Sequence, residues 1–304
     1  MKTKNTLTTL VTILFLPILV YGAITKYNHF PTLKPSHILD EKKNDISFAF
    51  SMRVLESDFE GSLMKLRRSS DNALQNFGWG DDDKVDIAAI DLWRNGSNVY
   101  LHTWYDQSGL GRDAVQTVNT MQPQFYPDAT IPYFQGDGTD DHLIIDTPNG
   151  LQDVTNNGDE GTILAIIRAT IKNQYAFGVV SSLCRWTGHV NWINNILYFD
   201  PGSCCDEDSR SIYNASNVNQ WSFYTLMHTN SHTMFRINAI EKSNKLSNNT
   251  ACTLTDDFLI GWANGAPSYA HSSTSFLEFI MYKKDVPSNI YQKIEESSMT
   301  FWGM

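Results

Sequence analysis

Short segments with the character of β-strands recur along most of the chain, and turns rich in Gly, Asp, Asn and Ser separate them. Helical patterns occur only at 85–92 and, just after Pro287, at 288–297. Parallel strands need long crossover connections, which are usually helical, so this order indicates antiparallel strands. The sequence therefore predicts an all-β fold, a two-sheet antiparallel β-sandwich with a short C-terminal helix.

The expected strands are rich in β-branched and aromatic residues, which pack well on a pleated surface. They are predicted at 46–54, 62–68, 99–105, 142–145, 162–169, 176–180, 195–199, 221–227, 233–237, 258–261 and 275–282. Nothing in the sequence divides them into two groups, and a chain of 304 residues with 41% hydrophobic residues can bury one large core. We expect a single domain over 45–304.

The charge balance is acidic, with 23 Lys and Arg against 33 Asp and Glu and a formal net charge of −10. Neutralising phosphate groups requires a basic surface, which this composition does not supply. Nucleic acids and anionic lipid surfaces are therefore not expected partners.

The N-terminus has the pattern of a secretory signal peptide over 1–22. Lys2 and Lys4 precede an apolar run from Leu7 to Tyr21 that is short for a spanning helix. We expect cleavage and a secreted, extracellular or cell-surface protein. The alternative is an uncleaved signal anchor, which would be the chain's sole link to a membrane. Residues 23–44 then form a leader or linker.

If the protein is secreted, its four cysteines are expected to form disulfides, because thiols usually pair in an oxidising compartment. They are Cys184, Cys204, Cys205 and Cys252. Cys204 and Cys205 either form a vicinal disulfide, leaving Cys184 with Cys252, or each joins a separate partner; we favour the second. No metal-ligand spacing accompanies these thiols, so zinc is not expected. Three glycosylation sequons, at Asn95, Asn214 and Asn248, are expected on exposed loops.

Two turns between Leu101 and Ile145 are rich in aspartate. Asp106 and Asp113 flank Gly109 and Gly111, and we expect these carboxylates to cap turn amides rather than to act in catalysis. The second turn holds Asp137, Asp140 and Asp141. These aspartates could supply oxygen ligands to Ca²⁺, but their spacing matches no known ligand order, so no cofactor is expected beyond this Ca²⁺ alternative.

Several of these motifs resemble the catalytic domain of alpha-L-arabinofuranosidase B. The resemblance lies in Tyr105-Asp-Gln-Ser-Gly-x-Gly-x-Asp113, Leu66-Arg-Arg-Ser-Ser-Asp-Asn-Ala73 and the turn 58–61. The segments 122–124, 136–143, 276–282 and 291–295 are similar to the wider group of concanavalin A-like, laminin G-like jelly rolls. Over 46–303 the resemblance implies a jelly-roll sandwich and a glycoside hydrolase ancestry.

The resemblance also implies where catalytic carboxylates would lie. The family's nucleophile is a Glu in a Met-Glu-x-Ile-Tyr-Phe strand, and Asn195 takes its place in Asn194-Asn-Ile-Leu-Tyr-Phe199. The acid/base Asp follows a Leu-Gly-x-Gly-Gly run, where this chain has Asn264 or Gly265. An amide can neither attack an anomeric carbon as a carboxylate does nor donate a proton at neutral pH. No catalytic residue is therefore expected.

A second alignment places the nucleophile elsewhere. The family has adjacent cysteines before its nucleophile strand, whereas Cys204 and Cys205 follow Phe199, so both matches cannot hold. If the cysteines are the true match, Glu241 and Glu278 become fallback catalytic candidates.

Aromatic and polar residues in the second half of the chain suggest a sugar site. Aromatic rings stack on the C–H faces of sugars, and amides and carboxylates bond their hydroxyl groups. The candidate ligand-binding residues are Trp186, Trp192, Asn195, Tyr198, Asp206, Trp262 and Asn264.

Three functional hypotheses follow. The first is a carbohydrate-binding or structural module that recognises glycans or cell-surface polysaccharide and lacks the family's catalytic carboxylates. The second is a retaining arabinofuranosidase-like enzyme. The third is an extracellular filament or coat subunit that self-assembles through the leader 23–44.

Overall fold

The computed structural model describes residues 37–41, 43–170, 174–181, 184–192, 195–203, 210–214, 219–247, 255–263, 265 and 271–304. Residues Ser36–Met304 form one compact unit. The predictions for 1–22, for the leader up to residue 36, and for Cys204, Cys205, Asp206, Asn248, Cys252 and Asn264 fall outside the described residues, as does the side chain of Cys184. In the described part, no helix is long and apolar enough to cross a membrane.

The described chain is mostly β-structure. Its strands are β1 (Ile46–Ser51), β2 (Met64–Arg68), β3 (Leu74–Phe77), β4 (Val99–Trp104), β5 (Ala114–Val115), β6 (Gln124–Tyr126), β7 (Tyr133–Gln135), β8 (Leu143–Ile145), β9 (Gly161–Arg168), β10 (Phe177–Val179), β11 (Cys184–His189), β12 (Ile196–Ser203), β13 (Ser211–Asn214), β14 (Ser222–His228), β15 (His232–Ile237), β16 (Ile240–Leu246), β17 (Phe258–Ile260) and β18 (Ser275–Tyr282). Its helices are α2 (Ile87–Arg94), a 3-10 turn η1 (Asn119–Met121), α3 (Leu151–Val154) and α4 (Ser288–Trp302).

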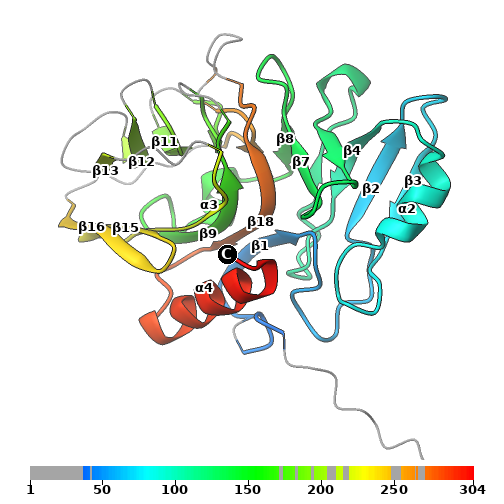
Figure 1. The fold of residues 1–304 in the computed structure, drawn as a ribbon. Coiled ribbons are helices and arrows are strands. Elements are labelled where there is room, and N and C mark those ends of the chain that lie inside the picture. The colour runs from blue at the N-terminus through cyan, green and yellow to red at the C-terminus, as the bar shows by residue number, and fades with distance from the viewer. Residues whose placement is uncertain are drawn as a thin grey trace, which may run out of the picture. The chain divides into compact units, whose positions relative to one another are not determined.

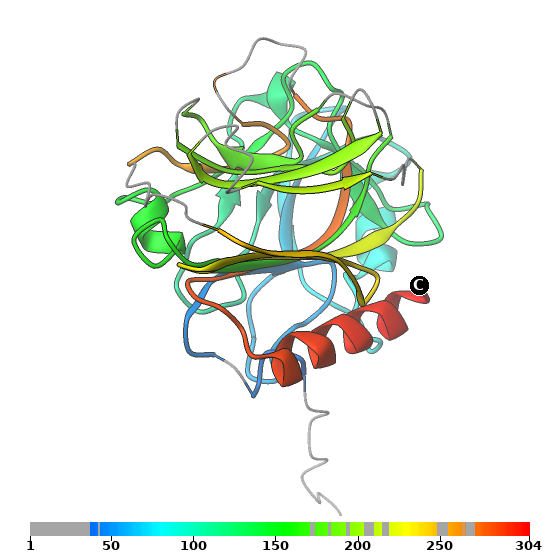
Figure 2. The ribbon, with the colours of Figure 1, turned by 90° about the vertical axis from the view of Figure 1, so that its left-hand side faces the viewer.

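All strand pairings are antiparallel, and the strands stack in two layers (Figure 1, Figure 2). The first sheet has the strand order β16–β15–β14–β9–β18–β1. Strand β1 pairs with the C-terminal part of β18, whereas the N-terminal part of β18 pairs with β7. From β7 the sheet continues through β6, β4, β2 and β3. The second runs β13–β12–β11–β10–β17–β8–β5. Strand β4 pairs with both β5 and β6 and so joins the layers. The predicted all-β sandwich is confirmed.

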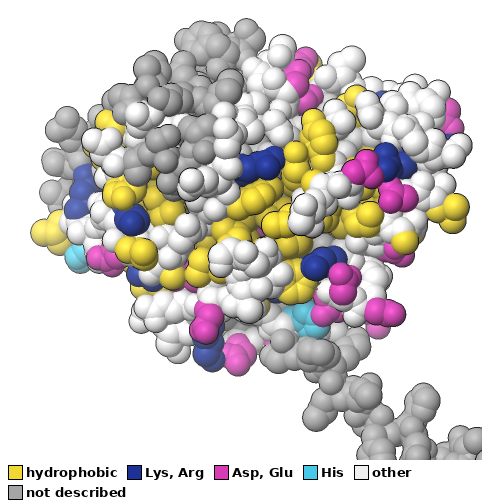
Figure 3. Space-filling view, viewed as in Figure 1, with side chains coloured by type: hydrophobic (Ala, Val, Ile, Leu, Met, Phe, Trp, Pro, Cys, Tyr) yellow, Lys and Arg dark blue, Asp and Glu magenta, His cyan; other side chains and the backbone are white. Residues whose placement is uncertain are grey.

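The core lies between the two sheets and is largely aromatic. Phe48 of β1 and Phe279 of β18 stack at 5.9 Å between centroids, and both rings contact Phe258 of β17 on the second sheet. Phe177 of β10 joins them, and all four side chains are fully buried. On the face shown in Figure 3, acidic and basic side chains are interspersed around a band of hydrophobic side chains.

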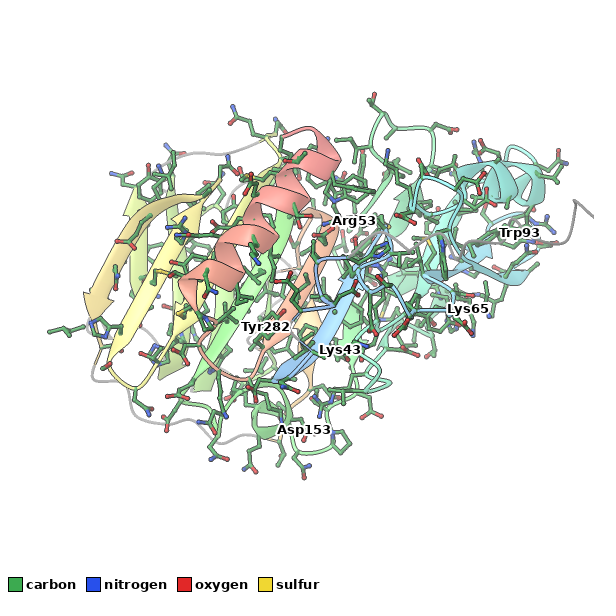
Figure 4. All side chains as sticks on the ribbon, turned by 90° about the horizontal axis from the view of Figure 1, so that it is seen from below. Lys43, Arg53, Lys65, Trp93, Asp153 and Tyr282 are labelled. Atoms are coloured by element: carbon green, nitrogen blue, oxygen red, sulfur yellow. The ribbon has the colours of Figure 1, made fainter. Side chains whose placement is uncertain are left out.

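Helix α4 covers the outer face of the first sheet, as Figure 2 and Figure 4 show. Its Glu295 is buried and accepts hydrogen bonds from Thr225 Oγ1 of β14 and from Arg236 Nε of β15, at 2.6 and 2.9 Å. The helix extends to Trp302, beyond the predicted end at residue 297. The two aromatic residues near the C-terminus therefore belong to the helix, and Trp302 is buried as its last residue.

The structure adds strands that the sequence pattern did not predict, among them β11, β13 and β16. Strand β16 has the sequence IEKSNKL, and none of its side chains is buried. A polar, exposed edge strand has no apolar alternation to mark it, because neither of its side-chain faces is buried. Its pairing partner β15 is largely buried and does have an apolar pattern.

Candidate functional site

Aromatic side chains gather at one end of the second sheet, where β10 and β8 begin and β11 and β17 end. The ring of Tyr175 lies 4.3 Å from that of His189, and the Trp192 ring lies 4.6 Å from His189. Trp262 stacks on His271 at 4.7 Å and contacts His142 at 5.2 Å. Trp192 and Trp262 both pack against Tyr175 and Ala263. We call these six ring-bearing residues the aromatic cluster: Tyr175, His189, Trp192, Trp262, His271 and His142.

Two glycines allow the chain to form the cluster. Gly261 follows β17 with φ of +90°, a conformation that L side chains rarely adopt, and its N–H donates to Ala176 O at 2.7 Å. Gly178 lies so close to the next strand that a Cβ would stand 2.5 Å from Thr187 Oγ1 and 2.9 Å from the Ala263 side chain. A side chain at 178 would push the connection that carries Trp262 away from β10, and a side chain at 261 would strain the backbone and crowd Asp141 O, 3.2 Å from its Cβ.

Several buried polar atoms of this region have no hydrogen-bond partner in the described structure. They are both amide atoms of Asn191, Oδ1 of Asn195 and Nε1 of Trp262. Asn191 is only 2% exposed. An unsatisfied buried polar group costs about 1–3 kcal/mol, so such groups usually indicate a bound water or a ligand. The connection between β11 and β12 and the turn after β17 thus both present free donors or acceptors beside aromatic rings.

A buried ion network lies beneath the cluster. The fully buried carboxylate of Asp200 accepts two hydrogen bonds from Arg210, at 2.6 and 2.8 Å, and has Arg185 Nη1 at 3.5 Å. His189 Nε2 lies 3.8 Å from the same carboxylate. Burial lowers the pKa of His189 to about 4, although Asp200 opposes this effect. The imidazole is therefore neutral at pH 7, and the network holds the β11–β12 pair together.

The structure brings together three of the predicted ligand-binding residues. Trp192 and Trp262 belong to the aromatic cluster, and Asn195, with φ of +63°, donates its N–H to Trp192 O at 3.1 Å. Tyr198 is half-buried on β12; its ring lies 6.1 Å from His189 and beneath the guanidinium of Arg210.

The prediction that Trp186 binds a ligand is wrong. Its side chain is fully buried in the core, where it packs on Phe199 and His228 and donates from Nε1 to Gly158 O at 3.1 Å. An indole without exposed surface cannot stack on a sugar, so Trp186 has a packing role. In the sequence, Trp186 on β11 and Trp192 just after that strand look alike, and only the three-dimensional structure shows that the first is buried.

The fallback catalytic candidates lie outside the aromatic cluster. Glu241 is exposed on β16, opposite Arg236. Glu278 is 1% exposed, and its carboxylate accepts hydrogen bonds from Arg53, Ser51, Ser298 and Trp302. Although burial alone would raise it, the pKa of Glu278 is lowered by Arg53 and these donors. This fully bonded carboxylate has a structural position and no exposed face for a substrate.

The first aspartate-rich turn has the capping role that we predicted. Asp106 Oδ1 accepts from the N–H groups of Ala49 and Ser108, both at 2.9 Å, and Oδ2 accepts from Arg112 N at 3.1 Å. Asp113 Oδ1 accepts from Asp106 N at 3.0 Å. These bonds tie the turn to β1.

In the second turn, one carboxylate oxygen each from Asp137, Asp140 and Asp141 lie within 4.8 Å of one another. Asp137 Oδ1 accepts from Thr139 N at 2.7 Å, and Asp141 Oδ2 accepts from Asp137 N at 3.0 Å. Burial, with a contribution from Asp137, raises the pKa of Asp141 to about 7. The backbone bonds account for this arrangement, and the Ca²⁺ alternative stays untested.

Two of the three sequons lie in the described structure. Asn95 is exposed at the C-terminal end of α2, with φ of +48°, and Asn214 is exposed at the end of β13. Both side chains face solvent, which glycosylation requires, although Asn214 belongs to a strand rather than a loop.

Other cluster residues were not identified from the sequence. Tyr175, His142, His189 and His271 carry no spacing that links them, since they come from four segments between residues 142 and 271. The strand register that brings these segments together depends on long-range pairing, such as Phe177 opposite both Gly188 and Ile260. The histidines therefore looked like ordinary structural residues.

Comparison with known proteins supports the fold. No family model and no curated protein sequence matches the chain. Among solved structures, a mutant of a GH54 α-L-arabinofuranosidase soaked with 4-nitrophenyl α-L-arabinofuranoside aligns with a TM-score of 0.63 at 12% identity, and a GH54 α-L-arabinofuranosidase soaked with a cyclic sulfate inhibitor aligns with a TM-score of 0.60 at 12% identity. An arabinofuranosidase complexed with arabinofuranosyl-α-1,2-xylobiose aligns at 0.57 and 11%.

Each of these alignments covers 85% of this chain but 63% of the solved structure. The chain thus spans less than two thirds of the arabinofuranosidases. At such low identity the likeness concerns the fold alone, and it confirms the arabinofuranosidase-like sandwich that the sequence motifs predicted.

Proposed function

We propose that this chain is a secreted or cell-surface carbohydrate-binding module, and that the aromatic cluster contacts the sugar. The observation that carries the proposal is the presence of unpaired polar atoms on Asn191, Asn195 and Trp262 beside the rings of the cluster. Sugars combine C–H faces, which stack on aromatic rings, with hydroxyl groups that both donate and accept hydrogen bonds. A sugar would satisfy both features of this surface.

The chemistry of the described residues favours binding over hydrolysis. A retaining glycosidase needs two carboxylates about 5 Å apart beside the sugar. Among the described residues, the carboxylate of Asp200 lies beside His189 of the cluster and is fully buried between Arg185 and Arg210. Because it is buried, it cannot reach an anomeric carbon or a leaving group. Asn195 also offers an amide where the resemblance implies a nucleophile.

The likeness to arabinofuranosidase structures makes arabinose-containing glycans the first ligands to test. Isothermal calorimetry with arabinose- and galactose-containing oligosaccharides should detect binding in the micromolar to millimolar range, which is about −8 to −4 kcal/mol. No heat of binding with any member of a broad glycan panel would contradict the proposal.

Hydrolysis is measured on the same protein with 4-nitrophenyl α-L-arabinofuranoside. We expect no release of nitrophenol above the rate of buffer alone. Release that is lost in Glu241→Gln or Glu278→Gln, with the fold retained, would instead establish the glycoside hydrolase alternative. Self-assembly through the leader stays a prediction, because most of that segment lies outside the described residues.

A further inference from the structure

A polar groove of about 460 Å³ lies on the first sheet, over β2, β4, β6 and β7. Its lining shares no residue with the aromatic cluster. Two tyrosines and several amides form most of the wall, together with one arginine. The principal lining residues are Arg67, Tyr100, Gln122, Gln124, Tyr126 and Gln135.

Strand register explains why these side chains share one face. Arg67 pairs with Tyr100, Tyr100 with Gln124, and Gln124 with Gln135, so the four residues form a row across four strands. Residues directly opposite one another in antiparallel strands project to the same side of the sheet. The intervening Phe125 and its partner Phe134 project to the other side and are buried in the core.

The row continues on the next two strands. Gln135 pairs with Ser275 of β18, and Ser275 pairs with Arg168 of β9. Ser275 Oγ donates to Gln135 Oε1 at 3.2 Å and accepts from Arg168 Nη2 at 3.1 Å. Six adjacent strands therefore present polar side chains at the same level, which gives the groove a rigid floor.

Arg67 is unusual among the buried arginines of the described structure. Arg53 and Arg236 are buried to a similar extent, and each has a buried glutamate partner. Arg67 is 7% exposed and donates to three neutral oxygens instead: Gln122 Oε1 at 2.6 Å, Asn119 O at 2.9 Å and Asn72 Oδ1 at 3.0 Å. No described carboxylate lies within ion-pair distance of it.

A buried charge is normally paired, because transfer from water into the protein is costly. The three bonds of Arg67 use three of its five guanidinium N–H groups, so two have no partner among the described residues, and Arg67 lines the groove. Its guanidinium also lies over the ring of Tyr100, at 4.6 Å from the centroid. The position is thus fixed before any ligand arrives, and bidentate recognition of a carboxylate is what a fixed guanidinium does best.

We propose that this groove is a second carbohydrate site and that it takes an acidic sugar, whose carboxylate pairs with Arg67. The amides of Gln124 and Gln135 form hydrogen bonds with the hydroxyl groups of the sugar, and the ring of Tyr126 stacks on the C–H face of the sugar. Asp137 and Asp141 line the groove beyond β7, three strands from Arg67, or on the order of 14 Å. The acidic group of the ligand therefore lies at the Arg67 end, away from these carboxylates.

The test is calorimetric titration of the full chain with α-1,4-linked trigalacturonate and with the matched neutral galactotriose. We expect the acidic trisaccharide to bind at least tenfold more tightly, since a charge-assisted hydrogen bond contributes roughly tenfold to hundredfold in affinity. Arg67→Gln should remove this preference and Arg67→Lys should keep part of it. Arg68→Gln, which changes the next residue of β2 and lies outside the groove lining, should leave it unchanged.

Arg67→Gln loses three structural hydrogen bonds, so its fold is checked by thermal melting. If it is unfolded, Gln124→Ala decides the question, because no hydrogen bond of the Gln124 side chain is present in the described structure; roughly threefold to tenfold weaker binding is expected. Equal affinity for the acidic and neutral trisaccharides, no binding of either, or an equal loss of the preference in Arg68→Gln would overturn the proposal. Sugar binding at the aromatic cluster is tested separately, with arabinose-containing ligands and Trp262→Ala.

Discussion

The indole N–H of Trp302 donates to Oε2 of Glu278 at 3.0 Å, so the last residue of α4 is bound to the middle of β18. Arg53 Nε reaches the same oxygen at 2.8 Å, and Ser298 Oγ donates to Oε1 at 2.5 Å. Figure 4 shows Arg53 beside the C-terminal part of α4. One buried carboxylate thus joins β1, β18 and the helix.

Replacing this carboxylate should strongly destabilise the fold. In Glu278→Gln the buried Arg53 loses its counter-charge, and breaking a buried pair costs about 3–5 kcal/mol in the free energy of unfolding. Urea denaturation of the variant and the wild type measures this difference. Trp302→Phe is the matched control, because it removes one hydrogen bond and should cost about 1–2 kcal/mol. A Glu278→Gln protein as stable as the wild type would contradict the assigned role.

The sequence predicted the strand that carries Glu278 but not the ion pair that Glu278 forms with Arg53. Strand β18 was predicted with its observed bounds, because SFLEFIMY is a nearly continuous apolar run. Glu278 in its middle gave no sign of its partner, since Arg53 lies 225 residues away in sequence. Apolar pattern predicts strands in the core, whereas polar edge strands and long-range pairs depend on the register of the whole sheet.

Asp106 should matter for stability and not for sugar binding. Asp106→Asn replaces one acceptor oxygen with an amide that faces N–H donors, so we expect a loss of about 1–3 kcal/mol in the free energy of unfolding. Exposed Asp81, for which the described structure gives no hydrogen bond or ion pair, serves as the control, and Asp81→Asn should change stability by less than about 0.5 kcal/mol. If Asp106→Asn abolished sugar binding without destabilising the protein, Asp106 would have a role in binding that capping of the turn does not explain.

Asp141 should make stability depend on pH between about 4 and 7. Its folded pKa of about 7 exceeds the ordinary value of 3.8, so in this window the folded protein keeps a proton that the unfolded chain has lost. The contribution is present at low pH and is lost as the pH rises through 7. Wild type should therefore lose on the order of 2–4 kcal/mol relative to Asp141→Asn between pH 4 and 8.

Thermal or urea unfolding of both proteins over this pH range, with a chelator present to remove bound cations, measures the effect. The control is Asp285→Asn, which replaces an exposed carboxylate for which the described structure gives no ion pair, and its curve should parallel that of the wild type. Parallel curves for wild type and Asp141→Asn would show that Asp141 titrates normally.

The candidate site was predicted only in part. Trp192, Asn195 and Trp262 were identified because aromatic and amide residues at those positions suit a sugar, and the structure places them around one cluster. Trp186 had the same appearance, but the packing of β11 turns it into the core. The groove around Arg67 could not be predicted, because its wall comes from strands whose alignment no local pattern specifies.

Sugar binding by the aromatic cluster can be tested with one set of titrations. An arabinose-containing oligosaccharide is titrated by calorimetry into the wild type, Trp262→Ala and Trp186→Phe. Loss of a stacking ring should weaken binding by roughly tenfold in Trp262→Ala. Trp186→Phe should lower the unfolding temperature and leave the affinity unchanged, since Trp186 is buried. Unchanged affinity in folded Trp262→Ala would mean that the sugar does not bind at the aromatic cluster.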